Sequence, residues 1–402
     1  MPAEPNNKKI ILMCHNYEPE YTLKEPDPAN RFFTYGFGGN LGKNIKLHNP
    51  DYDVEVWRLD GHINRNYYEG NVNGVRFKIF KSFRVDNLFE YSFKYFRELK
   101  KEVKQNDPIL ILLHTHYWLA YLALFKFKSS KIITTHHGEW SPFFRIKIMS
   151  GLRKLKARIE MVIEKRLFKY IDCILTIEKN QVPYFKMAFP GIRYIMWSSG
   201  VNFDSMKIIS KTEARKITDW DLNKKYIIYV GKLYKLKQAD DLIKMWLEIK
   251  KERPEVELAV IGCVPNDPWE EFYDMAKDSG AILIGRVLNS ELYKYLTAAD
   301  VCVLFALRDD YFGGTGIATL EALACRTPVV SYAMRNYIGN NPGDIAEVPD
   351  TVKKYKEAVL KVLDNPGIFK NMRESVFEHY SHESINKRVR PVLEELFASR
   401  KN

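Results

Sequence analysis

The sequence predicts an α/β protein made of two Rossmann-like, doubly wound parallel-sheet domains that face each other across a cleft. Short apolar runs bounded by Gly, Pro or Asp alternate with helical patterns from one end of the chain to the other. This pattern restarts after a polar, irregular segment near Ser198–Lys207. The 402 residues suffice for two or three domains at about 150 residues each.

Each half of the chain contains its own series of expected strands. In the first half they lie at 8–16, 53–60, 108–116, 131–137 and 172–179, with helical patterns between them, such as those at 88–105 and 145–169. In the second half they lie at 226–232, 256–262, 281–285, 301–306 and 328–333. Because strand–helix alternation produces parallel sheets, we expect domains over 1–200 and 201–380, with a binding site at the carboxyl ends of the strands. Residues 381–402 follow, and they include an amphipathic helical pattern from Glu383 to Ala398.

The composition excludes several classes of protein. A hydrophobic fraction of 46% excludes wholesale disorder. The five cysteines stand singly, which excludes a zinc ribbon or a disulfide framework, and the first residues lack the apolar core of a signal peptide. The longest apolar stretch is interrupted by His114 and His116 and is too short to span a membrane. We therefore expect a cytoplasmic protein.

The net charge of +12 calls for an acidic partner. Nucleotide phosphates, an anionic membrane surface and nucleic acid all qualify. The sequence contains no recognised nucleic-acid module, so we do not expect a nucleic-acid partner.

The strongest functional signal is the segment GGTGIATLEALACRTPVVSY at 313–332. Gly313, Gly314 and Gly316 allow a ligand to approach the backbone, and the helix that follows offers N–H groups and the positive end of its dipole to a phosphate. The carboxylate of Glu321 suits hydroxyl groups, such as those of a ribose. The alternative interpretation is a glycine-rich turn followed by a solvated glutamate.

This segment resembles the C-terminal signature of the retaining GT-B glycosyltransferases of family 4, through Glu321-Ala322-Leu323-Ala324 and Thr327-Pro328-Val329-Val330. The segment VGKLYKLKQADDLIKMW at 230–246 is similar to a second motif of that family, and the I-G-x-V turn at 284–287 follows in the family's order. The resemblance implies a GT-B fold and an enzyme of glycan biosynthesis. Such an enzyme moves a hexose from a UDP- or GDP-sugar to an acceptor hydroxyl with retention of configuration, and it needs no cofactor or obligatory metal.

The resemblance also implies roles for individual residues. Lys232 and Lys237 match the basic pair that clamps the nucleotide diphosphate, and we count both as catalytic. The remaining donor-binding positions of the second half are Gly231, Arg286, Val287, Gly314, Thr315, Gly316, Ile317 and Glu321.

The first half resembles the family more loosely. The segment HTHYWLAYLAL at 114–124 places His116 beside the donor sugar as a catalytic residue, while TTHHG at 134–138 makes His137 a possible sugar contact or a packing residue. Gly38 and Gly39, before a helix expected from Asn40, resemble a loop whose backbone approaches the donor. For His116 the alternative is a core histidine with satisfied hydrogen bonds. The final helix is expected to cross back to the first domain, as it does in the family.

The sequence departs from the family at several positions. Gly313 stands where the family has a glutamate that contacts the transferred sugar, and Asp309 or Asp310 could replace that contact. Lys232 replaces an arginine, which keeps the charge but loses the bidentate fork. Gln238 and Arg326 replace glycines at expected surface turns. These departures leave open a non-catalytic GT-B relative that acts as a binding or partner subunit.

Basic residues in the helix expected at 145–169 indicate what kind of acceptor the protein uses. Lys147, Lys154, Arg158, Lys165 and Lys169 fall on one face of the helix expected at 145–169. We expect the neighbouring apolar stripe to pack on the sheet and Glu160 and Glu164 to lie on the far side; the stripe consists of Ile148, Leu152, Leu155, Ile159 and Ile163. Such a cationic rim favours an anionic membrane surface, hence a lipid-linked or glycan acceptor and a peripheral position on the inner face of the membrane. The alternatives are an ordinary solvated helix face and a synthase with a soluble sugar acceptor.

Overall fold

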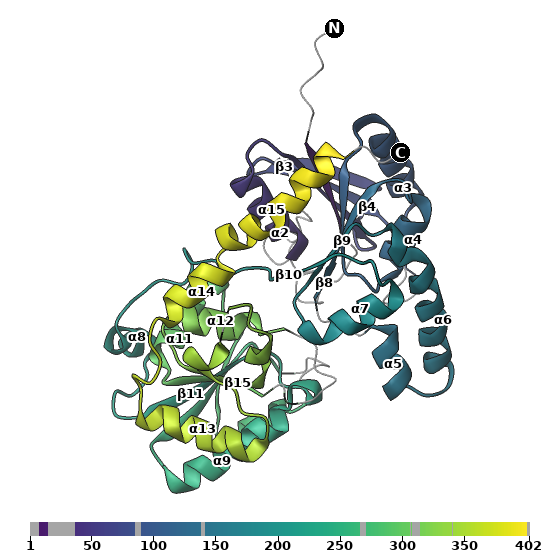
Figure 1. Ribbon diagram of the computed structural model, residues 1–402. Coiled ribbons are helices and arrows are strands. Elements are labelled where there is room, and N and C mark those ends of the chain that lie inside the picture. The colour runs from purple at the N-terminus through teal and green to yellow at the C-terminus, as the bar shows by residue number, and fades with distance from the viewer. Residues whose placement is uncertain are drawn as a thin grey trace. The chain divides into compact units, whose positions relative to one another are not determined.

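The computed structural model describes residues 8–14, 37–84, 90–137, 141–265, 271–305, 307, 314–339 and 341–399. The chain forms two compact units, which are coloured along the sequence in Figure 1. Unit 1 comprises residues 1–197 and 386–402, and unit 2 comprises residues 198–385. The sequence predicted domain boundaries after residues 200 and 380, within five residues of the observed boundaries after 197 and 385.

Unit 1 is built on an eight-stranded sheet with the strand order β10-β9-β8-β7-β1-β2-β4-β3. All neighbouring strands are parallel except β3 and β4. The strands are β1 (Lys9–Cys14), β2 (Asp53–Asp60), β3 (Tyr67–Val72), β4 (Val75–Lys81), β7 (Ile109–Leu113), β8 (Lys131–His136), β9 (Cys173–Thr176) and β10 (Tyr194–Met196). A separate antiparallel pair joins β5 (Phe83–Arg84) to β6 (Glu90–Tyr91).

The antiparallel edge of this sheet was not expected from the sequence. Strands β3 and β4 form a hairpin around Asn73 and Gly74, both of which have positive φ angles, of 53° and 80°. A two-residue Asn-Gly turn is a strong hairpin signal, because its twist matches that of the flanking strands. The strand–helix alternation hid this signal, because it predicts only parallel neighbours.

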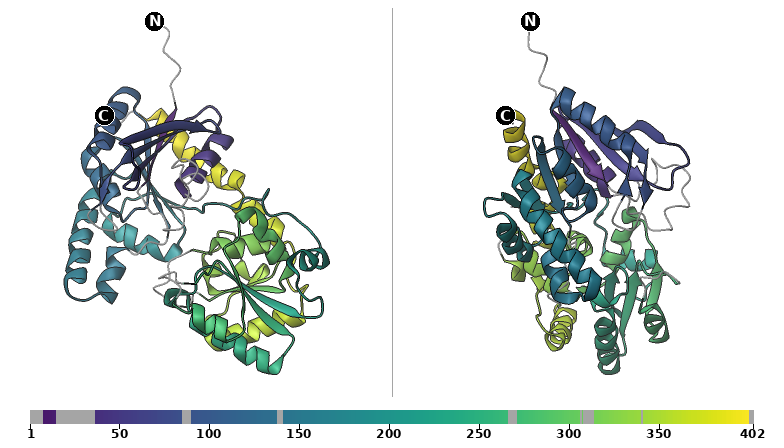
Figure 2. Two further views of the ribbon diagram at one scale, coloured as in Figure 1. Left: turned by 180° about the vertical axis from the view of Figure 1, so that it is seen from behind. Right: turned by 90° about the vertical axis from the view of Figure 1, so that its right-hand side faces the viewer.

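Helices cover both faces of the unit 1 sheet, as Figure 2 shows. They are α2 (Phe37–His48), α3 (Phe93–Asn106), α4 (Trp118–Lys126), α5 (Pro142–Ile148), α6 (Gly151–Leu167), α7 (Val182–Ala188) and the part of α15 (His382–Ala398) from Asn386 onward. The end of α15 packs beside β1 and β2: Lys8 Nζ lies 2.8 Å from a carboxylate oxygen of Glu394, and the Tyr52 hydroxyl donates to Glu394 over 2.7 Å. Residues far apart in sequence thus complete one unit.

The prediction of a single helix at 145–169 is wrong. Helix α5 ends at Ile148, and α6 begins at Gly151, whose φ of +56° lies outside the range of a continuous right-handed helix. The expected orientation is wrong as well, because Glu160 and Glu164 are buried while much of the apolar stripe is exposed. Of that stripe, Ile163 packs against the core of the unit. Buried partners explain the inversion: a carboxylate can face the interior when it is hydrogen-bonded or paired.

Unit 2 is built on a six-stranded parallel sheet with the order β13-β12-β11-β14-β15-β16. Its strands are β11 (Lys225–Val230), β12 (Val256–Ile261), β13 (Ile282–Gly285), β14 (Val301–Leu304), β15 (Val329–Ser331) and β16 (Ala346–Glu347). Its helices are α8 (Lys211–Thr218), α9 (Ala239–Glu252), α10 (Tyr273–Asp278), α11 (Asn289–Ala298), α12 (Ile317–Ala324), α13 (Val352–Asp364) and α14 (Met372–Tyr380). Large buried side chains such as Trp246, Tyr229 and Tyr355 fill its core. Within the described ranges of both units, no helix is long and apolar enough to cross a bilayer.

Candidate functional site

Each sheet has one point where its strand order reverses. In unit 1 this point lies between β1 and β7, and in unit 2 it lies between β11 and β14. The connections leave a crevice at the carboxyl ends of such strands, and ligands of doubly wound sheets bind there. Among the expected site residues, His116 follows β7, Lys232 and Lys237 follow β11, and the Gly314–Gly316 turn follows β14, whereas His137 follows β8 and Arg286 follows β13.

Three glycines form a ledge at the carboxyl edge of the unit 2 sheet. Gly231, Gly262 and Gly285 end or follow β11, β12 and β13, and their φ angles are 144°, 101° and 77°. The Gly231 N–H donates to the Ile261 carbonyl over 2.8 Å, and the Gly262 N–H donates to the Gly285 carbonyl over 2.7 Å. A Cβ at Gly262 would lie 3.4 Å from the Gly231 carbonyl oxygen. Gly262 was not expected at the site, although a glycine directly after a buried strand was the available signal.

Both predicted clamp lysines lie in the turn after β11. The ammonium group of Lys237 rests against Gly231, because a Cβ added there would be only 2.8 Å from Nζ. The Tyr234 ring centroid lies 5.6 Å from the same Nζ, and the Tyr229 hydroxyl donates to the Lys232 carbonyl over 2.8 Å. The turn therefore holds two half-buried lysines beside the glycine ledge.

The predicted phosphate cradle opens α12. Gly314 and Thr315 are buried, and Gly316 caps the helix with a φ of +75°. A Cβ at Gly316 would lie 2.7 Å from Leu304 Cδ2, so the chain needs glycine here. Because glycine has no side chain to cap the first turn, an anion can accept from the N–H groups that begin at Ile317. Asp309, Asp310 and Gly313 lie outside the described residues.

Glu321 is a buried carboxyl group on α12. Burial raises its pKa from 4.5 to about 7, and a hydrogen bond from Asn289 Nδ2, 2.6 Å from Glu321 Oε1, partly opposes this shift. Asn289 begins α11, directly after the loop of Arg286, which is exposed, and Val287, which is half-buried. Asn289 was missed because only the fold brings it to Glu321.

Two departures from the family have a common backbone explanation. Gln238 and Arg326 adopt left-handed conformations with φ angles of 54° and 62°, which glycine adopts without strain. Gln238 also bridges two segments. Its Oε1 accepts from the Leu307 N–H over 2.8 Å, and its Nε2 donates to Asp241 Oδ2 over 2.9 Å.

In unit 1, His116 is held by a buried carboxylate. Its Nδ1 lies 2.7 Å from Glu164 Oε1, which also accepts from the Tyr121 hydroxyl over 2.5 Å, while the Tyr184 hydroxyl donates to Oε2. A carboxylate oxygen accepts hydrogen bonds, so we assign the hydrogen to Nδ1. Within the described parts of the chain, the buried His116 Nε2 has no hydrogen-bond partner. The ring is therefore satisfied on one side only.

His137 is packed among rings. Its Nε2 lies 2.6 Å from Thr135 Oγ1, and its ring centroid is 5.0 Å from that of His114 and 5.2 Å from that of Trp197. The role of His137 as a sugar contact or a packing residue stays a prediction.

The glycines of the first loop lie inside a helix, not before it. Gly38 and Gly39 belong to the first turn of α2, which begins at Phe37 rather than at Asn40. A Cβ at Gly38 would lie 2.5 Å from Cys14 Sγ and 2.7 Å from Leu113 Cδ1. Gly38 thus allows α2 to approach the carboxyl ends of β1 and β7.

The predicted site residues fall into three groups. His116, His137, Gly38 and Gly39 follow the unit 1 strands, whereas both clamp lysines, the cradle, Glu321 and the Arg286 loop follow those of unit 2. The basic set is divided among α5, which carries Lys147, α6, and the short turn after α6 that contains Lys169.

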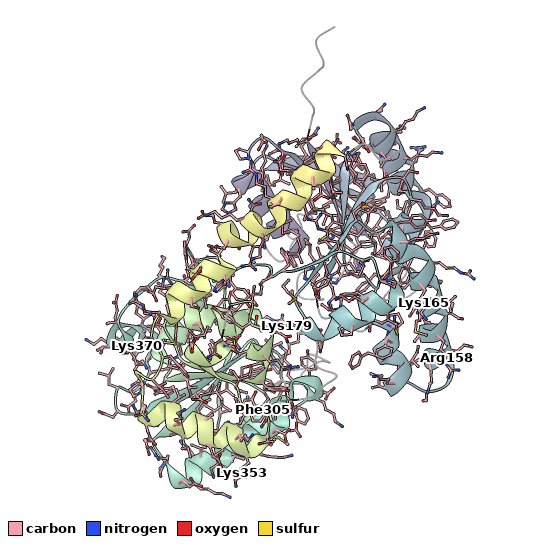
Figure 3. All side chains as sticks on the ribbon, in the orientation of Figure 1. Arg158, Lys165, Lys179, Phe305, Lys353 and Lys370 are labelled. Atoms are coloured by element: carbon pink, nitrogen blue, oxygen red, sulfur yellow. The ribbon has the colours of Figure 1, made fainter. Side chains whose placement is uncertain are left out.

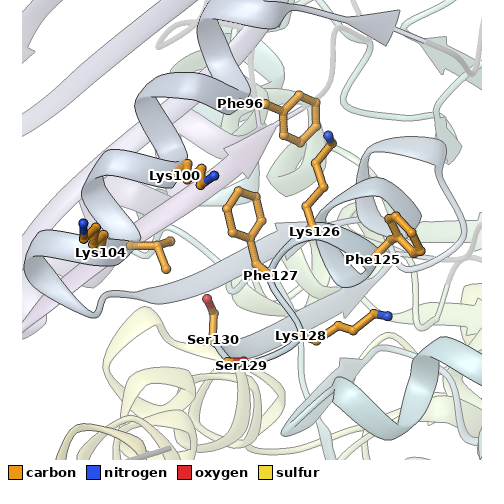
Figure 4. A pocket seen from close by; sticks show the side chains of 10 residues that line it. Phe96, Lys100, Lys104, Phe125, Lys126, Phe127, Lys128, Ser129 and Ser130 are labelled. Atoms are coloured by element: carbon orange, nitrogen blue, oxygen red, sulfur yellow. The ribbon is translucent and has the colours of Figure 1, made fainter.

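A pocket that was not predicted lies in unit 1 between α3 and the segment after α4 (Figure 4). Its volume is about 650 Å³. Its lining combines aromatic and basic side chains with two serines: Phe96, Lys100, Val103, Lys104, Phe125, Lys126, Phe127, Lys128, Ser129 and Ser130. It lies near the start of β8, at the opposite edge of the sheet from His116.

Comparison with known sequences identifies the class. Residues 210–393 match the family described as "Glycosyl transferases group 1", and residues 46–202 match "Glycosyltransferase Family 4". The chain belongs to the group 1 glycosyltransferases and has the GT-B fold.

Individual relatives are distant. An uncharacterized glycosyltransferase of Methanocaldococcus jannaschii is 23% identical over 339 residues, which cover 80% of this chain and 83% of that protein. A GDP-mannose-dependent monoacylated alpha-(1-6)-phosphatidylinositol monomannoside mannosyltransferase of Corynebacterium glutamicum is 25% identical over 66% of this chain and 70% of its own. Among solved structures, sucrose-phosphate synthase from Thermosynechococcus elongatus superimposes with a TM-score of 0.70 at 15% identity, covering 98% of this chain and all of that one.

Proposed function

We propose that this glycosyltransferase transfers a hexose from a UDP- or GDP-sugar to an acceptor hydroxyl with retention of configuration. The observation that carries the proposal is the arrangement in unit 2, where a glycine ledge, two lysines, a glycine-capped helix and a buried carboxyl group follow strands β11 to β14 of the sheet. These groups match the parts of a nucleoside diphosphate: anionic phosphates and a ribose with adjacent hydroxyls.

The diphosphate binds beside the glycine ledge and the first turn of α12. Lys232 and Lys237 supply positive charge, while the turn beginning at Gly316 supplies backbone donors. When the glycosidic bond breaks, negative charge develops on the diphosphate, and donors already placed there stabilise it. The two lysines perform this role in the proposed reaction, so no obligatory metal or cofactor is assigned.

The ribose binds at Glu321. An ionised carboxylate accepts hydrogen bonds from two neighbouring hydroxyls, and Asn289 holds one of its oxygens in place. Arg286 and Val287, in the loop directly before α11, contact the base in this proposal.

His116 contacts the transferred sugar. The Glu164 contact keeps the hydrogen on Nδ1, which leaves Nε2 as an acceptor for a sugar hydroxyl. We assign no enzymic general base. The donor phosphate itself takes the acceptor's proton, because attack and departure occur on the same face of the sugar.

The acceptor is lipid-linked, and the protein works as a peripheral protein at the cytoplasmic face of the membrane. Two observations support this. The mannosyltransferase of Corynebacterium glutamicum is named for a monoacylated phosphatidylinositol monomannoside, and α6 of this chain presents basic residues to solvent.

Nucleotide binding tests the donor site directly. Lys237→Ala removes a charged hydrogen bond of about 1.5–3 kcal/mol, so the dissociation constant of UDP or GDP should rise about 10- to 100-fold. Lys235→Ala is the matched control, because Lys235 is an exposed lysine in the same short helix, Lys235–Lys237. Titration calorimetry with both nucleotides measures the effect. Equal affinities of the two variants and the parent protein would remove Lys237 from the donor site.

A further inference from the structure

Helix α6 is apolar on the side that faces solvent. The exposed fractions are 84% for Leu152, 52% for Leu155, 53% for Ile159 and 50% for Val162, and Ile148 at the end of α5 is 46% exposed. The opposite side carries the buried residues Ala157, Glu160, Glu164 and Leu167. Exposed large apolar side chains that gather on one helix face mark an interaction surface.

Within residues 142–170, the exposed charges beside the apolar face are all positive. The only acidic residues in 142–170 are Glu160 and Glu164, and both point inward: Glu160 pairs with Arg145 at 2.5 Å, and Glu164 holds His116. Exposed cations on α5, α6 and the turn after α6 are Lys147, Arg153, Arg158, Lys165, Arg166 and Lys169. Figure 3 labels Arg158 and Lys165 on α6, at the edge of unit 1.

Charge decides what covers this face. A second copy of the chain joined through the same face would bring two cationic surfaces together, which costs free energy. An anionic bilayer offers both complements, because its headgroups attract lysine and arginine while its acyl boundary accepts leucine and isoleucine. We propose that α5 and α6 dock in the plane of an anionic membrane, with Leu152, Leu155 and Ile159 inserted below the headgroups.

The proposal reverses the expectation from the sequence, in which the apolar stripe packed on the sheet. The proposal extends the proposed function, because membrane docking would bring the enzyme to a lipid-linked acceptor. It therefore rests on the proposed function for its biological role. The same helix carries Glu164 on its inner face, so the docked helix places His116 about one helix diameter, roughly 10 Å, from the headgroups.

A second basic surface continues from the end of α6. Lys128 lines the pocket in Figure 4, and its Nζ lies 5.6 Å from the ring centroid of Tyr170. Tyr170 is the residue that follows Lys169 in the sequence. Lys169 lies 5.1 Å from the same ring. The cationic area of unit 1 thus extends from α6 toward α4.

Insertion can be measured with a fluorescent probe at one position. All five native cysteines are buried, so an environment-sensitive fluorophore will label Leu155→Cys selectively in the folded protein. We expect a blue shift with vesicles of equimolar phosphatidylcholine and phosphatidylglycerol, and none with phosphatidylcholine alone. The same probe at Leu47→Cys, an exposed position on α2, should not shift with either vesicle.

A set of variants separates docking from folding. Replacing Leu152, Leu155 and Ile159 together by Gln should lower binding to the anionic vesicles by at least about a hundredfold, because half-burial of each side chain favours the bilayer about tenfold. The matched control replaces Leu47, Ile217 and Val352 by Gln, three exposed apolar residues of α2, α8 and α13, and should bind as the parent protein does. Affinity for UDP or GDP without vesicles should be unchanged in both.

Three results would overturn the proposal. The first is a Leu155 probe that does not shift, and the second is a triple variant that binds vesicles as tightly as its control. The third is a dimer in sedimentation that the triple variant abolishes, since the face would then join two copies. Vesicle binding without nucleotide binding would instead contradict the proposed function and leave the docking surface standing.

Discussion

Burial of the Glu321 carboxyl group lowers stability at neutral pH, and we propose that ribose binding is the reason for keeping it. Its folded-state pKa of about 7 exceeds the ordinary 4.5, so the folded state retains a proton that the unfolded chain loses between these values. The free energy of unfolding therefore falls as the pH rises from 4.5 to 7 and levels off above 7. This pKa difference corresponds to about 3 kcal/mol at high pH.

A substitution separates the two effects. Glu321→Gln should raise the free energy of unfolding at pH 8 by up to about 3 kcal/mol and at pH 5 by less than about 1 kcal/mol, because glutamine cannot ionise. Its affinity for UDP or GDP should be lower than the parent's at pH 8, and the parent's advantage should shrink toward pH 6. Chemical denaturation and calorimetry measure both. Glu291→Gln, at a half-buried position on α11 where the carboxylate pairs with Lys294, is the control. A stability gain that does not depend on pH would contradict the account.

At the scale of single residues, the sequence indicates groups whose role follows from a local motif. Lys232, Lys237 and Glu321 stand at motif positions and lie near the glycine-rich turns of unit 2. Glu164 was misjudged and Asn289 was missed. Their partners are distant in sequence: Glu164 meets side chains of α4 and α7, and no periodicity within α6 reveals those contacts.

At the scale of elements, α6 shows why an amphipathic pattern does not determine which side is buried. Its apolar stripe predicted the packed face, yet the packed face is the one with carboxylates. Hydrogen bonds with Tyr121, Tyr184 and His116 offset the desolvation of Glu164, and an ion pair with Arg145 does the same for Glu160. Polar partners on neighbouring elements therefore overrode the apolar stripe.

Helix α15 contributes buried side chains to unit 1. Truncating one of them should therefore lower the free energy of unfolding of this unit. Leu393 is fully buried, so Leu393→Ala should lower the free energy of unfolding of unit 1 by about 2–5 kcal/mol. Leu47→Ala, which truncates an exposed leucine of the same unit, should cost less than about 1 kcal/mol. Hydrogen exchange of β1 and β2 amides localises the effect, and equal protection in the two variants would show that α15 does not stabilise the sheet.

At the scale of the whole molecule, the strand–helix alternation predicts the two parallel sheets, and the resemblance to the family predicts the GT-B fold. The alternation did not predict the antiparallel hairpin β3–β4, because it predicts only parallel neighbours. The Asn73-Gly74 turn was the local signal for this hairpin. Both reversal points carry expected site residues: Gly38 and His116 in unit 1, and Lys232 and the Gly314–Gly316 turn in unit 2. The chemistry of these residues requires more than the fold, because many activities share doubly wound sheets.

The most direct test of the proposed function is release of nucleoside diphosphate from four donors: UDP-glucose, UDP-galactose, UDP-N-acetylglucosamine and GDP-mannose. Each donor is incubated with the protein and anionic vesicles that carry a lipid extract as acceptor. We predict release from one donor, lost in Lys237→Ala and kept in Lys235→Ala. Tight binding of UDP or GDP without release from any of the four donors would contradict the account and indicate a binding subunit rather than an enzyme.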